Sequence, residues 1–303
     1  MDLLNGRFSL QMPEGSVNQA RGHNVMAAPE SNERETRLVY EKGEKKMVVM
    51  AWELFRKVGD NFDEEVNKAF KSWVDKDAVF KIKSAGEHAR MALIEKPNEK
   101  GDAILYGVGC VRQKDGTLQL VKVYFNPNFH KESGACFALT EQVLASIQLG
   151  KRALMLEKGE RSLPFLLDES RLSVQVPEGW TFSTTQGPDF LVNSLREVSV
   201  FGEPAQQVGI YVGGHPSYHH QKIDPEKVVK KTRKSLFLGK ECEWFEFYEK
   251  GEEDWKSVEL IYPLGEGGYW NMHVFSGGRN EESLQKVLKI AATLKIEANQ
   301  DSE

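Results

Sequence analysis

Three histidines lie close together in the segment GGHPSYHHQ, residues 213–221 of the chain. Imidazole nitrogens suit zinc, copper and nickel, so His215, His219 and His220 are a weak candidate metal site. A fourth strong ligand at a spacing typical of metal sites is missing from the sequence. We therefore predict a polar loop that holds no metal. His273 lies between Met272 and Val274 in a strand-like run, where we predict a hydrogen-bonded sheet histidine.

The sequence motifs of covalent and phosphate chemistry are missing from the chain. It contains no Gly-x-Ser-x-Gly, no His-Glu-x-x-His and no Gly-x-x-x-x-Gly-Lys. The segment GVGC, residues 107–110, lacks the later glycine and the helix of a dinucleotide site. We predict no catalytic residue, no cofactor and no enzymatic activity. A hydrolase whose carboxylates converge from distant strands remains the minor alternative.

Aromatic side chains concentrate in the second half of the chain, most densely in WFEFYEK, residues 244–250. Most of them are predicted to pack in a core, because alternating strand aromatics pack under helices. Trp180, Trp255 and Tyr269 each adjoin a predicted turn. We therefore predict that these three stay partly exposed and anchor a protein partner, a role that tryptophan and tyrosine commonly have.

A repeat indicates how these residues are positioned. RFSLQMPEG at residues 7–15 and RLSVQVPEG at 171–179 share Arg, Ser, Gln, Pro, Glu and Gly at identical offsets. The alternating apolar residues predict a half-buried strand that ends at Pro-Glu-Gly. The chain is thus predicted to be a tandem duplication of one unit.

The same order of elements is predicted after each copy of this strand. A hairpin is predicted at residues 37–55 and 197–214, and a helix at 63–74 and 224–236. In the second helix, Asp224 is the expected N-cap, and the basic cluster 227–234 is the expected solvated helix surface. Three strands are predicted at 85–125 and 238–275, and a closing helix at 132–149 and 281–294.

This order of elements resembles the PsbP-like fold, which the Ran-binding Mog family, the bacterial DcrB lipoproteins and the Eag-type chaperones of type VI secretion share. The local likeness to the DcrB group is strongest over residues 236–296, where the glycine, charged turn, meander and closing helix fall in that family's order. The resemblance implies an α+β fold of two PsbP-like α/β/α units, each an antiparallel sheet flanked by helices. The predicted domains are 1–150 and 163–303, with a linker at 151–162.

Composition narrows the function classes. The formal net charge of −5 is too weak to predict a nucleic-acid partner, and no apolar run is long enough to predict insertion into a membrane. If Met1 is the native start, we expect a cytoplasmic protein; with a leader removed, we expect the periplasm or cell envelope. The resemblance implies a bacterial protein-binding factor of adaptor, chaperone or immunity type. An envelope-associated DcrB-like protein is the alternative.

Overall fold

The computed structural model describes residues 1–19, 31–59, 61–73, 79–97, 103–130, 132–166, 170–201, 205–252, 254–265 and 269–297. These residues group into two compact units. Unit 1 contains the described residues within 1–22, 33–154 and 199–203, and unit 2 contains those within 23–32, 155–198 and 204–303. The predicted linker therefore includes structured chain, because Gly159–Leu163 is a strand, β11, of unit 2.

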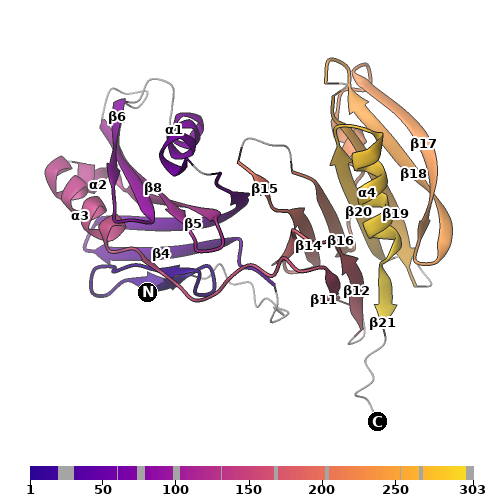
Figure 1. The fold of residues 1–303 in the computed structure, drawn as a ribbon, viewed down its shortest axis with the longest axis horizontal. Coiled ribbons are helices and arrows are strands. Elements are labelled where there is room, and N and C mark those ends of the chain that lie inside the picture. Colours follow the sequence, from indigo (N-terminus) through magenta and orange to yellow (C-terminus); the bar gives the residue numbers. More distant parts are fainter. Residues whose placement is uncertain are drawn as a thin grey trace, which may run out of the picture. The chain divides into compact units, whose positions relative to one another are not determined.

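Unit 1 is built on a large antiparallel sheet with the strand order β3-β4-β5-β9-β8-β7-β6 (Figure 1). A short further strand, β15 (Ser199–Val200), pairs with β5 in parallel. The predicted hairpin at 37–55 is confirmed as β4 and β5, which join at Gly43, whose φ is +59°. The strands are β3 (Val17–Asn18), β4 (Glu35–Lys42), β5 (Lys45–Lys57), β6 (Val79–Ser84), β7 (Ala89–Pro97), β8 (Ala103–Arg112) and β9 (Thr117–Phe125).

The two faces of this sheet are covered by different elements. One face packs under α3 (Ser133–Ala145) and a small sheet of β1 (Asp2–Leu3), β2 (Phe8–Ser9) and β10 (Gln148–Leu149). A short helix, α2 (Pro127–His130), precedes α3. The other face packs under α1 (Phe62–Trp73), through the buried side chains of Phe62, Val66 and Phe70. The predicted helix at 63–74 is thus confirmed as an amphipathic cover.

Unit 2 is also built on a large antiparallel sheet, with the order β13-β14-β16-β20-β19-β18-β17. One face packs under α4 (Glu281–Ala292) and a small sheet of β11, β12 (Arg171–Val176) and β21 (Lys295–Glu297). Asn280 caps α4 by accepting a hydrogen bond from the Ser283 N–H at 2.8 Å, as typical N-caps do. The strands are β13 (Trp180–Gln186), β14 (Phe190–Glu197), β16 (Gln207–Gly213), β17 (Val228–Phe237), β18 (Lys240–Glu249), β19 (Lys256–Leu264) and β20 (Trp270–Gly278).

The two units share one topology, which confirms the duplication. In chain order, β3 to β9 of unit 1 correspond to β13, β14 and β16 to β20 of unit 2, with the same neighbours in each large sheet. The small sheets correspond as well: β2 pairs with β1 and β10, and β12 pairs with β11 and β21. The matching phrases of the sequence therefore lie in equivalent strands, β2 and β12.

The units differ in the segment between their third and fourth large-sheet strands. In unit 1 this segment contains α1, of 12 residues. In unit 2 it contains a 3₁₀ turn, η1 (His219–Lys222), of 4 residues. The second face of the unit 2 sheet therefore has a smaller cover than its counterpart in unit 1.

The predicted α+β class, with each sheet flanked by helices, is wrong. Strands make up 52% of the described residues and helices 16%, in four sheets that are mostly antiparallel. The physical reason is that small three-stranded sheets share one face of each large sheet with a single long helix. The chain is β-rich, and strands do much of the covering that the sequence pattern assigned to helices.

The helix predicted at 224–236 is wrong, because Val228–Phe237 is the edge strand β17. The N–H groups of Lys227 and Val228 bond to the Asp224 carbonyl, so the apparent N-cap closes a turn. From Val228 to Phe237 every residue is paired with β18. Leu238 and Gly239 join β17 to β18 with φ values of +48° and +74°, as a tight two-residue hairpin requires. The basic cluster lines an exposed sheet edge, where lysines discourage further strand pairing.

The hairpin predicted at 197–214 is shifted in the structure. The strand at Gln207–Gly213 pairs with β14, Phe190–Glu197, which lies before the predicted first strand. Ser199 and Val200 belong instead to unit 1 as β15. The predicted meanders at 85–125 and 238–275 and the helices near 132–149 and 281–294 are confirmed.

Candidate functional site

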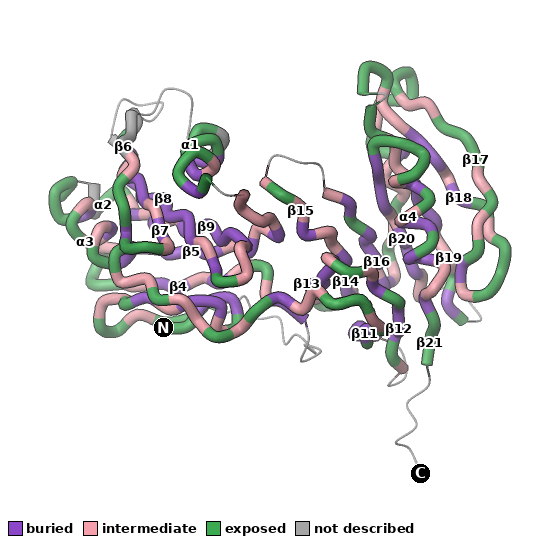
Figure 2. The backbone as a smooth tube through the Cα atoms, in the orientation of Figure 1, coloured by how far each residue is buried: buried purple, intermediate pink, exposed green. Residues whose placement is uncertain are grey.

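The second face of the unit 2 sheet carries a cluster of half-buried large side chains. Alternation along the strands decides which residues lie on it: Val274 and Leu260 point into the core, while their neighbours Phe275 and Ile261 point away from it. Figure 2 shows the alternation of buried and partly buried positions along these strands. We call this surface the aromatic face and define it by its half-buried members Phe190, Tyr211, Phe245, Ile261 and Phe275.

Glycines let the aromatic rings lie flat along the sheet. A Cβ atom on Gly209 would lie 2.2 Å from the Phe275 ring, and one on Gly213 would lie 2.4 Å from the Tyr211 hydroxyl. Phe190 and Tyr211 stack with ring centroids 5.8 Å apart. Ring packing over strand glycines replaces the side chain that the glycine lacks and fixes the ring's position. The aromatic face is thus held in place before any ligand arrives.

The loop before β17 is tied to this face by one buried carboxylate, Glu259. Its Oε2 accepts hydrogen bonds from the His219 N–H at 2.7 Å and from His273 Nε2 at 2.9 Å. Its Oε1 accepts from the His220 N–H at 3.0 Å and lies 2.7 Å from His220 Nδ1. The side chain of Glu259 is fully buried, and those of His220 and His273 are nearly so. The prediction of a hydrogen-bonded sheet histidine at 273 is confirmed.

The electrostatics of this cluster keep Glu259 ionised. Burial acts to raise the pKa of Glu259, but the hydrogen bonds from His273, from the two backbone N–H groups and from the His220 ring outweigh it and lower the pKa to about 2. Burial lowers the pKa of His219, and the neighbouring His273 adds to this effect. A buried carboxylate with four donors is a structural tie for the loop, since all of its lone pairs face the protein's own groups.

The candidate metal ligands are only partly brought together. His219 and His220 meet His273 around Glu259, with the His219 and His273 ring centroids 5.0 Å apart. His215 is exposed and its N–H bonds to the Tyr211 hydroxyl at 3.3 Å. Within the described ranges, no group of three or more His, Cys, Asp or Glu side chains has the geometry to hold a metal ion. The histidine rings instead pack on aromatic rings. The ring centroids of His219 and Phe275 lie 4.5 Å apart, and those of His220 and Phe245 lie 5.0 Å apart.

The three predicted partner anchors differ in exposure. Trp180 is 0% exposed and packs in the unit 2 core, so the prediction that it stays accessible is wrong. It begins β13 directly after the turn, and its ring points inward under α4, where Lys286 lies 5.4 Å from the ring centre. Tyr269 is 67% exposed and Trp255 is 36% exposed. These two side chains remain available to a partner, although they lie at strand ends outside the aromatic face as defined.

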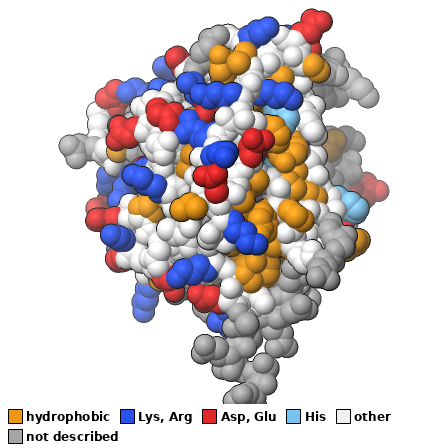
Figure 3. Space-filling view, turned by 90° about the vertical axis from the view of Figure 1, so that its right-hand side faces the viewer, with side chains coloured by type: hydrophobic (Ala, Val, Ile, Leu, Met, Phe, Trp, Pro, Cys, Tyr) orange, Lys and Arg blue, Asp and Glu red, His pale blue; other side chains and the backbone are white. Residues whose placement is uncertain are grey.

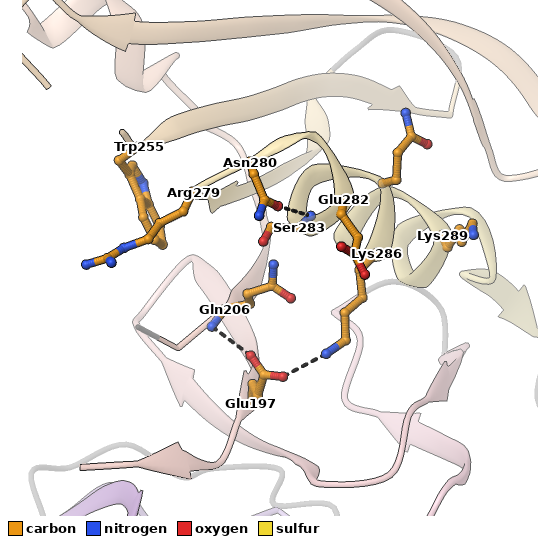
Figure 4. A pocket seen from close by; sticks show the side chains of 10 residues that line it. Glu197, Gln206, Trp255, Arg279, Asn280, Glu282, Ser283, Lys286 and Lys289 are labelled. Atoms are coloured by element: carbon orange, nitrogen blue, oxygen red, sulfur yellow. Dashed lines mark hydrogen bonds and ion pairs between the residues drawn. The ribbon is translucent and has the colours of Figure 1, made fainter. Parts of the chain in front are cut away.

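A polar pocket of about 520 Å³ lies in unit 2 beside the start of α4 (Figure 4). Its wall includes Trp255 and Arg279 on one side and Glu197 on another. Lys286 pairs with Glu197 at 2.7 Å, and the Asn280 side chain is used by the α4 cap. These polar side chains of the wall are therefore engaged in contacts within unit 2, and we assign the pocket no chemical role.

Unit 1 contains a mostly buried polar cluster around Arg7. Arg7 Nε donates to Glu53 at 3.0 Å and Nη1 donates to Asp115 at 2.8 Å, and Gln119 donates to Glu53 at 3.0 Å. Burial raises the pKa of Glu53 to about 7 although Arg7 opposes the shift. At Asp115 burial is outweighed by Arg7 and Thr117, and the pKa falls to about 2. Since Arg7 also donates to the Arg152 carbonyl at 2.8 Å, the cluster fastens chain segments together.

Comparisons with known proteins name no family. No family model and no curated protein matches the chain. A solved mutant of protein Mog1 is 11% identical, with a TM-score of 0.31, over 50% of this chain and 94% of that one. A structure of MucB in complex with MucA(peri) is 13% identical, with a TM-score of 0.20, over 88% of this chain and 93% of that one. A Pseudomonas aeruginosa MucA/MucB complex is 12% identical, with a TM-score of 0.19, over 97% and 93%.

TM-scores this low carry no argument about function. One of these structures is of a protein of the Mog family, which the sequence pattern resembles. No helix in the part of the chain that the structure describes is long and apolar enough to cross a membrane.

Sequence reasoning missed Glu259, Phe245, Ile261 and Phe275 as members of one surface. Each lies in a predicted strand, where a single alternating pattern assigns one side to the core and leaves the other unspecified. The one available signal was the lone acid in SVELIY, residues 257–262, which interrupts an apolar run. A buried strand acid requires donors, and the nearby histidine-rich loop supplies them.

Proposed function

We propose that this chain is a non-enzymatic protein-binding factor of adaptor, chaperone or immunity type, and that it holds its partner on the aromatic face of unit 2. One observation carries the proposal. In unit 1 the part of the equivalent face on β7, β8 and β9 is buried under the 12-residue helix α1, whereas in unit 2 Tyr211, Ile261 and Phe275 are half-buried beside a 3₁₀ turn of 4 residues. Clustered, fixed aromatic side chains are typical of the energetic centre of a protein interface.

The surroundings of this face support binding of a macromolecule. Figure 3 shows hydrophobic side chains gathered in a band on one face of the molecule, with lysines and arginines beside it. Leu236 on the edge strand β17 of the same sheet is 56% exposed. A contiguous apolar surface rimmed by charge is uncommon on a monomer without a partner. Small-molecule sites, in contrast, are concave and enclose their ligand.

The test uses a matched pair of substitutions in the full chain. Ile261→Glu puts a charge on the aromatic face, and Ile296→Glu puts the same charge on β21, where Ile296 is already 42% exposed. Both proteins are checked for an unchanged circular dichroism spectrum and thermal midpoint. Each is then used as immobilised bait in extracts of the source cell, and retained proteins are quantified by mass spectrometry.

We expect one protein that the unchanged chain and Ile296→Glu retain equally and that Ile261→Glu retains at least tenfold less. That loss equals about 1.4 kcal/mol, a modest effect for an interface centre. Equal retention by both variants contradicts the assignment of the aromatic face. Retention of no protein by any bait, together with turnover of a compound in a substrate screen, contradicts the proposed class.

A further inference from the structure

Because the two units share one topology, the element that packs on the equivalent face of unit 1 indicates what kind of element can cover the aromatic face. In unit 1 the equivalent face seats α1, whose Phe62, Val66 and Phe70 lie at i, i+4 and i+8 and are at most 5% exposed. They pack on strands β7, β8 and β9 through Ile94, Val108 and Leu120, among others. One chain therefore contains two versions of the same sheet face, one with an amphipathic helix packed on part of it and one with a short 3₁₀ turn in the same place.

The unit 2 face has a smaller cover than the α1 helix of unit 1. The η1 turn lies over parts of β18, β19 and β20. The His220 ring centroid lies 5.0 Å from that of Phe245, and the His219 ring centroid lies 4.5 Å from that of Phe275. Tyr211, Ile261 and Phe275 on β16, β19 and β20 are half-buried beside this turn. Three adjacent strands span roughly 10 Å, which matches the diameter of a helix with its side chains.

An extended peptide fits this surface poorly for a reason of hydrogen bonding. Strands β16 and β20 are paired on both sides along their length, and β19 is paired on both sides at 257–259, so these backbone groups are already used within the sheet. A strand lying across them has no backbone partner and must leave its own N–H and C=O groups unsatisfied. A helix satisfies its backbone internally and can present apolar side chains alone to the sheet.

The charge beside the face specifies one flank of that helix. Lys230 lies opposite Phe247 on the same face of the sheet, and Lys222 ends the η1 turn. Both are exposed. Their neighbours Lys231 and Lys234 are paired with Glu246 and Glu241, whereas Lys222 and Lys230 form no ion pair within the described residues. A partner whose acidic side chains lie toward β17 compensates this charge, whereas a basic one is repelled.

We infer that the occupant of the aromatic face is an amphipathic helix of the partner protein, with large apolar side chains at i, i+4 and i+7 or i+8 and an acidic flank toward β17. This inference rests on the proposed function and narrows it to one class of partner segment. It predicts that the face binds helices presented as isolated peptides, independently of the rest of the partner.

The probe peptide is taken from helix α1, which packs on the equivalent face of unit 1. A peptide of residues 61–73 with Lys71→Glu keeps the apolar stripe of α1 and increases its acidity. A lactam between Glu64 and Lys68, which already form an exposed i,i+4 ion pair at 2.7 Å, holds the peptide helical. Its fluorescently labelled form is titrated with the full chain, and binding is followed by anisotropy.

We expect a dissociation constant of about 10–100 μM, as for a small interface made by one helix. Ile261→Glu weakens binding at least tenfold, Ile296→Glu changes it less than twofold, and Lys222→Glu with Lys230→Glu weakens it about fivefold at low salt. A peptide of the same composition, with its apolar residues scattered around the helix, binds at least tenfold more weakly.

Three results overturn the inference. They are no binding of the probe at 1 mM, equal binding of the scattered peptide, and a wild-type dimer that Ile261→Glu dissociates in sedimentation experiments, which would make a second copy the occupant. In the first two cases the bait experiment remains informative: a partner still lost from Ile261→Glu keeps the aromatic face as a binding surface and rejects only the helix.

Discussion

Replacing Glu259 by glutamine tests whether one buried carboxylate holds the histidine loop on the sheet. Each oxygen of Glu259 accepts two hydrogen bonds, at 2.7 and 2.9 Å for Oε2 and at 2.7 and 3.0 Å for Oε1. In Glu259→Gln one oxygen becomes an NH₂ group, which faces one backbone N–H and one histidine ring nitrogen. The ring nitrogen can accept from this NH₂ in its other tautomer, but the backbone N–H is left buried without an acceptor, and the remaining hydrogen bonds lose the acceptor's charge.

The expected loss at pH 7 is about 3–5 kcal/mol of unfolding free energy, because hydrogen bonds to charged groups contribute about 1.5–3 kcal/mol each. The pH dependence of the unfolding free energy provides a second measure of how much ionised Glu259 contributes. The pKa of Glu259 is lowered from 4.5 to about 2, so the ionised form stabilises the fold fully above pH 4.5 and less as the pH falls toward 2. The shift corresponds to about 3 kcal/mol, which the wild type loses in that window and the variant does not.

Urea unfolding followed by tryptophan fluorescence measures both quantities. The buried Trp180 and Trp244 report on unit 2. Glu282→Gln is the matched control, because Glu282 is exposed on α4. A loss below about 1 kcal/mol at pH 7, or equal acid dependence of the wild type and Glu259→Gln between pH 2 and 5, refutes the role assigned to the carboxylate.

Two further expectations follow from burial. Trp180→Ala lowers the unfolding free energy by about 3–5 kcal/mol because the ring is fully buried, whereas Tyr269→Ala, at an exposed position, changes it by less than about 0.5 kcal/mol; comparable losses in urea unfolding would contradict this contrast. Burial raises the pKa of Glu53 from 4.5 to about 7, so the folded protein keeps a proton there that the unfolded chain has released, and stability falls as the pH rises from 4.5 to 7. Glu53→Gln removes this fall, about 3 kcal/mol between pH 5 and 8, and an unchanged pH profile of unfolding would reject the shifted pKa.

The repeat made much of the fold readable from the sequence. Helix α1 was predicted because Val66, Ala69, Phe70 and Trp73 repeat at helical spacing over a sufficient length. At 224–236, Asp-Pro-Glu followed by a lysine-rich run satisfies the rules for a helix start, yet the segment pairs with β18 along its whole length. Its conformation depends on a partner strand, and single-segment rules do not include that partner.

The candidate site was less accessible to sequence reasoning. Glu259 and His220 are 39 positions apart, and their meeting depends on the sheet that places β19 under the loop. The half-buried state of Ile261 depends on how small the element over this face is, which becomes visible only when η1 is compared with α1 of unit 1. A pattern of alternating residues identifies two sides of a strand but does not say which side a third element covers.

Strand β15 is synthesised later than all the other strands of unit 1. It completes unit 1 by pairing with β5, and the Phe201 N–H bonds to the Lys57 carbonyl at 2.8 Å. Yet the rest of unit 1 ends at residue 154, so β15 leaves the ribosome only after β11 to β14 of unit 2. At about 5–20 residues per second, this delay lasts roughly 2–10 seconds. During that interval the nascent unit 1 exposes the end of β5 as a free strand edge, so we expect truncated chains that end near residue 154 to self-associate more readily than the full-length protein.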